Sequence, residues 1–243
     1  MIPIFDLDDT LYPERSYVES GFRAVASWGE KQFRWPASDS FKCMRELLVS
    51  YGRGRVFDLW FEQKGERPTR SLVRAALRIY RHHNPDIALP ESHRALLESL
   101  GKRGQLYLVT DGHKIVQSKK VNALGLASLF TGIYITHRYG RTAAKPSARC
   151  FDLIRKRENV SWGDIVYVGD NPAKDFITIN KLGGTTIRVL TGNHANDPAC
   201  PGFDASRRVK CLTEIEPILD ECFTELNSNH PLIGSSAAEV SGN

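Results

Sequence analysis

Acidic and hydroxyl side chains follow several short apolar segments of the chain. Asp6 and Asp8 come directly after the first of these segments, Thr110 and Asp111 follow the next, and Asp170 follows a later one. Neighbouring carboxylates repel each other and stay ionised together only when a cation or a basic group lies among them. Hard oxygen ligands in a site with room for water suit Mg²⁺. If these residues converge, the pattern predicts an acidic magnesium site.

The segments that carry these residues alternate between strand and helix patterns. This alternation predicts an α/β fold with a Rossmann-like parallel sheet and helices on both faces. Right-handed crossovers bring the carboxyl ends of such strands to one edge, so we expect the polar residues to meet there. The predicted strands cover residues 2–7, 105–110, 132–136, 165–169 and 185–190. The predicted helices cover residues 91–101, 114–124, 148–158, 174–182 and 213–226.

A helical insertion separates the first strand from this alternating region. Apolar residues recur there at spacings of three and four, which predicts helices but no strand. We therefore expect an α/β core formed by residues 1–12 and 91–226, a helical cap at 13–90 and a disordered tail at 227–243, where Ser, Asn, Gly and Ala are frequent. The predicted cap helices cover residues 17–33, 41–51, 56–61 and 72–80.

A net charge of +5 can indicate that a protein binds a polyanion, so the location of the charge matters. Residues 13–90 contain 14 Lys or Arg and 9 Asp or Glu, so the whole positive excess lies in the helical insertion. No helix-turn-helix signature or zinc finger accompanies it, and we expect a small phosphorylated substrate rather than a nucleic acid polymer.

The distribution of apolar residues and cysteines indicates where the protein acts. The most apolar runs, such as residues 106–109, are far shorter than the roughly 18 residues needed to cross a bilayer, so no membrane partner is expected. The first residues carry no secretory signal pattern, and the five cysteines show no CxxC spacing. We expect a cytoplasmic protein with reduced thiols, whose oligomeric state the sequence does not determine.

Four motifs, in this order along the chain, resemble those of the haloacid dehalogenase (HAD) superfamily. Residues 5–11, FDLDDTL, resemble the first motif, DxDxT, and residues 108–112 resemble the second, an apolar strand ending in Thr. Lys145-Pro146 resembles the third, and residues 169–175, GDNPAKD, resemble the fourth, GDxxxxD. The helical insertion is similar to the family's type I cap. Among capped members, the chain looks most similar to nucleotide and N-acylneuraminate phosphate phosphatases.

This resemblance implies roles for three of the acids. Asp6 would attack phosphorus and form an aspartyl-phosphate, since a carboxylate needs no proton removed to act as a nucleophile. Mg²⁺ would be held by Asp6, the backbone carbonyl of Asp8 and Asp170, and would neutralise the charge of the substrate. Asp8 would protonate the leaving oxygen and then activate water. An acid at this position is typical of members that hydrolyse or transfer phosphate esters, which disfavours dehalogenation.

The resemblance also assigns residues around the phosphoryl group. Lys145 would place a positive charge on the phosphoryl oxygens, and Thr110 with the Asp111 backbone N–H would donate hydrogen bonds to them. Lys145-Pro146 is expected to open a helix. Thr10 and Asp175 would support the site from outside, Asp175 by orienting Lys145 or metal-bound water. A capping or salt-bridging role of Asp175 in the following helix is the alternative.

The resulting hypothesis is a Mg²⁺-dependent phosphomonoesterase that acts on a small phosphorylated metabolite, either a sugar phosphate or a nucleotide. In the cap, Arg53 and Arg55 flank a glycine and are candidate substrate contacts, with a solvated loop as the alternative. If the positive excess of the cap faces the site, the leaving group should be acidic or polar. The other functional hypotheses are a phosphomutase of the same superfamily and a non-catalytic module that binds a phosphorylated ligand.

Overall fold

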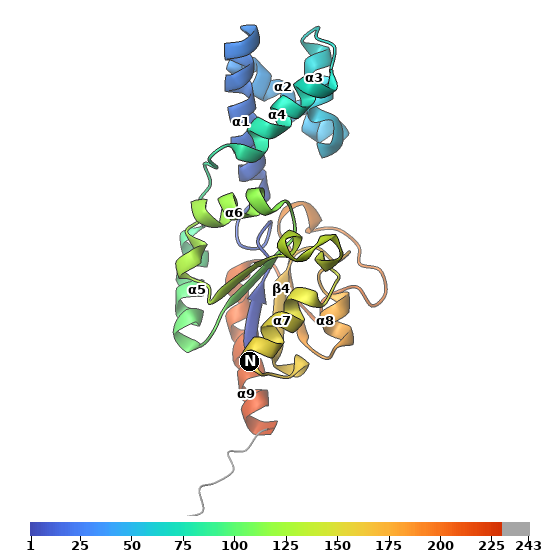
Figure 1. Ribbon diagram of the computed structural model, residues 1–243. Coiled ribbons are helices and arrows are strands. Elements are labelled where there is room, and N and C mark those ends of the chain that lie inside the picture. The colour runs from blue at the N-terminus through green and yellow to red at the C-terminus, as the bar shows by residue number, and fades with distance from the viewer. Residues whose placement is uncertain (230–243) are drawn as a thin grey trace, which may run out of the picture.

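The computed structural model describes residues 1–229, and it describes side chains up to residue 224. A six-stranded sheet in the order β3-β2-β1-β4-β5-β6, with all neighbouring strands parallel, forms its centre (Figure 1). This arrangement confirms the predicted α/β class. The strands are β1 (Ile2–Phe5), β2 (Tyr107–Thr110), β3 (Gly132–Ile135), β4 (Ile165–Gly169), β5 (Thr185–Val189) and β6 (Arg207–Val209).

Helices cover both faces of the sheet, as predicted. One face packs against α5 (Glu91–Arg103), α6 (Lys114–Ala123) and α9 (Ile215–Asn229), and the other packs against α7 (Arg149–Glu158) and α8 (Ile177–Lys181). The strands β1, β2 and β4 are buried along their whole length. Continuous apolar runs are typical of parallel strands that are covered on both faces.

The four helices between β1 and α5 lie together beyond the carboxyl ends of the strands (Figure 1). Their shared apolar core is rich in aromatic side chains, among them Trp60 and Phe61, and is separate from the two clusters that flank the sheet. None of the helices within residues 1–229 is long and apolar enough to cross a bilayer. The four helices are α1 (Glu14–Phe33), α2 (Ala37–Tyr51), α3 (Val56–Gln63) and α4 (Arg70–His82).

The structure differs from the sequence-based expectations mainly at element ends. The prediction did not include β6, whose first two residues are exposed arginines that break the apolar pattern of a strand. The helix predicted at 174–182 is reduced to α8 because Asp175 turns back to the loop before it. Helix α9 continues to Asn229, and the rest of the predicted disordered tail, residues 230–243, lies outside the described residues.

Candidate active site

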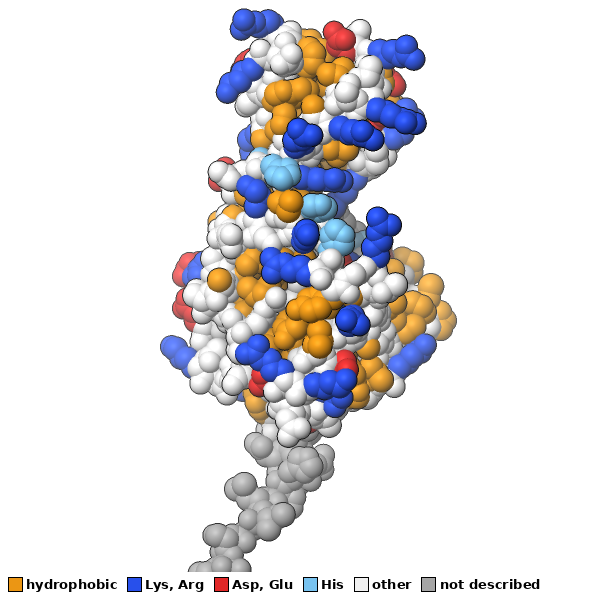
Figure 2. Space-filling model, in the orientation of Figure 1, with side chains coloured by type: hydrophobic (Ala, Val, Ile, Leu, Met, Phe, Trp, Pro, Cys, Tyr) orange, Lys and Arg blue, Asp and Glu red, His pale blue; other side chains and the backbone are white. Residues whose placement is uncertain are grey.

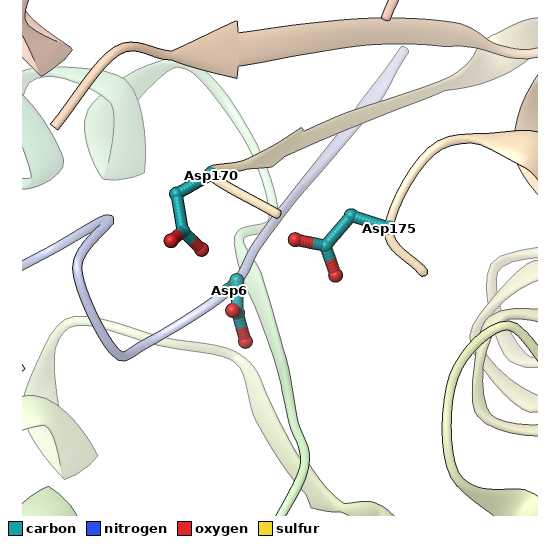
Figure 3. Close-up of side chains that lie close together, drawn as sticks. All are labelled: Asp6, Asp170 and Asp175. Atoms are coloured by element: carbon teal, nitrogen blue, oxygen red, sulfur yellow. The ribbon is translucent and has the colours of Figure 1, made fainter. Parts of the chain in front are cut away.

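Three carboxyl groups meet at the carboxyl edge of the sheet (Figure 3). Asp6 directly follows β1, Asp170 directly follows β4, and Asp175 lies in the loop after β4. Each offers an oxygen atom within 4.8 Å of the others, and all three residues are buried. Because β1 and β4 are neighbours in register, with Phe5 opposite Val168, their ends bring Asp6 and Asp170 together. Of the acids expected to converge, Asp6 and Asp170 therefore lie together here, and Asp175 joins them.

Lys145 provides the cation among these acids. Its Nζ lies 2.9 Å from Oδ1 of Asp6 and 2.8 Å from Oδ1 of Asp175, and it donates a hydrogen bond of 2.8 Å to the Tyr167 hydroxyl. Burial lowers the pKa of Lys145, but attraction to Asp175 and Asp6 outweighs burial and raises the pKa well above its usual value. Lys145 therefore stays charged. It does not open a helix as predicted, because α7 begins only at Arg149.

The acids carry more negative charge than Lys145 can balance. Burial raises the pKa of Asp6 to about 6, although Lys145 opposes the shift. Burial, together with repulsion by Asp6 and Asp175, raises the pKa of Asp170 to about 9. A divalent cation between these oxygens would relieve both effects, and carboxylate oxygens are the ligands that Mg²⁺ prefers. The residues present therefore fit a magnesium ion.

The Asp8 side chain lies outside this cluster of acids. Lys120 donates to both of its carboxylate oxygens, at 2.7 and 2.9 Å, and Tyr12 and Gln117 donate to it at 2.7 and 3.0 Å. Burial raises the pKa of Asp8, but the attraction of Lys120 and these hydrogen bonds outweighs burial and lowers the pKa. While these contacts persist, Asp8 is ionised and paired with the Lys120 ammonium group.

The residues at the end of β2 serve mainly to hold neighbouring segments. The Thr110 hydroxyl accepts a hydrogen bond of 2.6 Å from Gln117. The Asp111 carboxylate accepts hydrogen bonds from the Thr136 hydroxyl at 2.8 Å and from the Lys145 backbone N–H at 3.1 Å, and its other oxygen lies 3.2 Å from Lys174 Nζ. Burial raises the pKa of Asp111, but Lys145 and Lys174 outweigh it and lower the pKa. Asp111 thus ties the Lys145 segment to β2.

The two remaining supporting residues behave differently from each other. Asp175 accepts hydrogen bonds from the Asn171 backbone N–H and from Tyr167 while it contacts Lys145. It therefore combines the predicted orientation of Lys145 with a local turn. Thr10 is buried, and its hydroxyl has no hydrogen-bond partner among the described residues.

The two cap arginines do not act as a pair. Arg53 donates hydrogen bonds to both carboxylate oxygens of Glu14, and it lines a cavity of about 310 Å³ between the four-helix region and the ends of β1 and β2. Arg55 is exposed and does not line this cavity. Figure 2 shows Lys and Arg side chains on the outer surface of the four-helix region. Only Arg53 of the basic residues between 13 and 90 lines the cavity.

Several residues of the site were not predicted from the sequence. Gln117 and Lys120 lie three residues apart, a spacing that places them on one face of α6, but the neighbouring Lys119 makes Lys120 read as a surface residue. Tyr167 lies inside β4 and reads as an ordinary core residue. Glu14 reads as a first-turn acid of a helix. The only sequence indication was the spacing of Gln117 and Lys120 behind Thr110.

Comparisons with known proteins agree with this geometry. A family model for haloacid dehalogenase-like hydrolases matches residues 4–183. The chain is 29% identical to a glyceraldehyde 3-phosphate phosphatase of Methanopyrus kandleri over 88% of the chain and 97% of the relative. It is 26% identical to a phosphoserine phosphatase of Thermus thermophilus over 80% of the chain and 90% of the relative.

A solved structure with a similar fold is the HAD-hydrolase YfnB of Bacillus subtilis, which was solved with bound magnesium. The TM-score is 0.66 at 20% identity, and the match covers 90% of this chain and 98% of that one. This likeness supports the fold.

Proposed function

Because the chain belongs to the haloacid dehalogenase-like hydrolase family and its named relatives are phosphatases, we propose that it is a Mg²⁺-dependent phosphomonoesterase of small phosphorylated metabolites. The observation that carries the proposal is the buried contact of Asp6 with Lys145 beside Asp170. An anionic nucleophile, a fixed cation and a carboxylate able to share a metal ion are the groups that phosphoryl transfer requires.

Asp6 is the proposed nucleophile. Its carboxylate attacks phosphorus, the bond between phosphorus and the leaving oxygen breaks, and an aspartyl-phosphate forms. Lys145 lies 2.9 Å from the Asp6 carboxylate and is kept charged by Asp175, so it can attract the phosphoryl oxygens without a proton transfer. Asp6 and Asp170 would hold Mg²⁺, with the Asp8 backbone carbonyl as a further ligand. When bound, the ion would neutralise charge on the phosphoryl group.

Asp8 is the proposed acid and base. In the first half of the reaction its carboxyl group delivers a proton to the leaving oxygen. In the second half its carboxylate takes a proton from the water that attacks phosphorus, the bond between phosphorus and the Asp6 oxygen breaks, and phosphate and the free Asp6 carboxylate are released. The lowered pKa that Lys120 causes suits the second half. A protonated Asp8 no longer attracts the ammonium group, so the first half requires the contact with Lys120 to loosen.

Replacement of the nucleophile tests the proposal. Asp6→Asn keeps the shape of the side chain but removes the anion, so we expect phosphate release to fall below about 1% of the wild-type rate, a loss of more than roughly 3 kcal/mol in the barrier. Phosphate release from glyceraldehyde 3-phosphate and phosphoserine is measured with Mg²⁺, together with a melting curve. Asp39→Asn, at an exposed position of α2, is the matched control and should behave as wild type.

Chelation of divalent ions provides the second arm of this experiment. The wild-type rate should be lost in chelator and restored by added Mg²⁺, but not by Ca²⁺, because its looser coordination misplaces the nucleophile. Retained turnover in Asp6→Asn would contradict the covalent mechanism, and full activity in chelator would contradict the metal. A rate that depends on an added sugar bisphosphate would indicate a phosphomutase instead.

A further inference from the structure

The cavity beside the proposed acid lies where a leaving group must be placed. Asp8 and Asp111, which follow β1 and β2, line its floor, and the cap helices form its walls. A volume of about 310 Å³ is at the lower end of the roughly 300–1,000 Å³ found for small-molecule sites. A phosphate ester bound at Asp6 would therefore extend its alcohol part into this cavity.

The walls of the cavity are mostly apolar. Side chains from α1, α3 and α4 contribute to them, and three aromatic rings among these lie close together. The ring centroids of Phe22, Phe57 and Tyr80 are separated by 5.8 to 6.1 Å, with tilted or edge-to-face geometry. The wall residues that carry this argument are Val18, Phe22, Phe57, Val73, Leu77 and Tyr80.

The charges that line the cavity leave no cation for an acidic leaving group. Arg53 is engaged by both oxygens of Glu14, and Lys120 is engaged by both oxygens of Asp8. Asp58 also lines the cavity and has no ion pair among the described residues. An anionic group placed here would face an unpaired carboxylate and find both cations occupied, which costs binding energy.

A histidine at the cavity does not change this balance. His113 lines the cavity, and its pKa is lowered by burial and by the neighbouring Arg81 guanidinium. The lowered pKa disfavours a charged His113 beside an anionic leaving group.

We propose that the leaving group is an uncharged, apolar alcohol with an aromatic or branched aliphatic body, held between α1, α3 and α4. This inference rests on the proposed phosphatase function and narrows its substrate class. It replaces the acidic or polar leaving group that the positive charge of residues 13–90 had predicted, because those charges lie outside the cavity apart from Arg53.

Matched phosphate esters test the leaving group. Benzyl phosphate, glyceraldehyde 3-phosphate and phosphoserine all release primary alcohols, so differences in kcat/KM report the fit of the alcohol part. We expect kcat/KM for benzyl phosphate to be at least tenfold higher than for either polar ester. For the isosteric pair 4-methylbenzyl and 4-carboxybenzyl phosphate, the carboxylate should lower kcat/KM at least tenfold.

Two variants connect these preferences to the cavity. Val73→Phe fills the wall position on α4 and should lower the ratio of kcat/KM for benzyl phosphate to that for phosphoserine at least tenfold. Val49→Phe, the same change at an exposed position of α2 outside this cavity, is the control and should leave the ratio unchanged. Asp58→Asn should raise kcat/KM for 4-carboxybenzyl phosphate relative to its methyl partner, and this variant retains the shape of the side chain.

The outcomes separate this inference from the proposed function. A preference for phosphoserine or glyceraldehyde 3-phosphate over benzyl phosphate would overturn the inference and leave the phosphatase intact. If no ester is turned over, the proposed function fails. Calorimetry in the presence of Mg²⁺ then tests whether the cavity binds an apolar group. In that case benzylphosphonate should bind at least tenfold more tightly than methylphosphonate, and equal affinities would overturn the inference.

Discussion

Two buried lysines divide the carboxylates of the site between them. Lys145 contacts Asp6 and Asp175, whereas Lys120 contacts Asp8 and Glu14. The side chains of the two lysines are only 1% and 3% exposed, so each ammonium acts at short range in a poorly screened environment. One lysine therefore serves the proposed nucleophile, and the other serves the proposed acid and base.

Replacement of Lys120 separates these two roles. Lys120→Met keeps the apolar stem but leaves Asp8 and Glu14 without their shared cation, so we expect kcat to fall by tenfold or more and stability to fall by about 3 kcal/mol. The loss should be at least as large for aryl esters as for esters with basic leaving alcohols, because loss of Lys120 raises the pKa of Asp8, which impairs the base step that both classes share but favours the protonated Asp8 that basic leaving alcohols need. Phosphate release and urea unfolding measure the two effects.

Lys119→Met is the control, since Lys119 contacts Asn84 on the surface and none of the acids. Equal rates of Lys120→Met and wild type on both ester classes would show that Lys120 does not act on Asp8.

At this scale, the sequence predicts the residues at the carboxyl ends of strands. Asp6, Thr110 and Asp170 could be identified because each comes next to an apolar run, and parallel strands share one carboxyl edge. Lys120 could not, because its partner Asp8 is more than a hundred residues away and a lysine on a helix is usually exposed. Its burial follows from the packing of α6 beside the β1 loop, which no local pattern records.

At the scale of elements, the turn after β1 is joined to two other segments by Asp9. Its backbone is left-handed, with φ of 54°, and its carboxylate accepts hydrogen bonds from the backbone N–H groups of Glu14 and Asn193. The first contact supplies the side-chain cap that Pro13 cannot give to α1. A single carboxylate therefore links β1, the first cap helix and the loop after β5.

Removal of this carboxylate should destabilise the junction. Asp9→Ala loses the cap of α1 and the contacts with Asn193, and it places a β-carbon without a polar side chain in a left-handed conformation. We expect a loss of about 2–4 kcal/mol in the free energy of unfolding, measured with urea. Asp9→Asn retains an acceptor and tolerates this backbone, so it should lose clearly less. Equal stabilities of Asp9→Ala and wild type would contradict the linking role.

The elements themselves were mostly predictable, with errors that have a physical cause. Strands β1, β2 and β4 were found because burial on both faces produces unbroken apolar runs. Strand β6 was missed because, as the last strand of the sheet, it begins with the exposed Arg207 and Arg208. An edge strand is partly exposed to solvent and can carry polar side chains, so the apolar pattern used to find strands is weakest there.

At the scale of the whole molecule, the apolar residues form separate clusters. One cluster lies inside the four-helix region, and two others flank the sheet. Trp60 is fully buried in the first cluster, where Trp28, Trp35 and Phe61 surround it. The chain enters this region after Tyr12 and leaves it before α5, so few covalent constraints join it to the sheet.

This arrangement predicts local loss of structure when the cap core is weakened. Trp60→Ala should cost about 3 kcal/mol or more and should speed native-state hydrogen exchange in α1–α4 about a hundredfold, with little change in β1, β2 and β4. Phe151→Ala, which removes a buried ring between α7 and the sheet, is the control and should produce the opposite pattern. A uniform increase over all elements after Trp60→Ala would show that the molecule unfolds as one unit.

The position of β1 in the middle of the sheet has a consequence for how the protein is synthesised. Ile4 pairs with Tyr107, and Ile2 pairs with Ile165, about 160 residues later. At roughly 5–20 residues per second, a ribosome needs about 8–30 s to make the second partner after the first strand has emerged. All contacts within the aromatic core of α1–α4 are available long before then. We therefore expect the helical region to fold on the nascent chain before β1 can pair with β2 and β4.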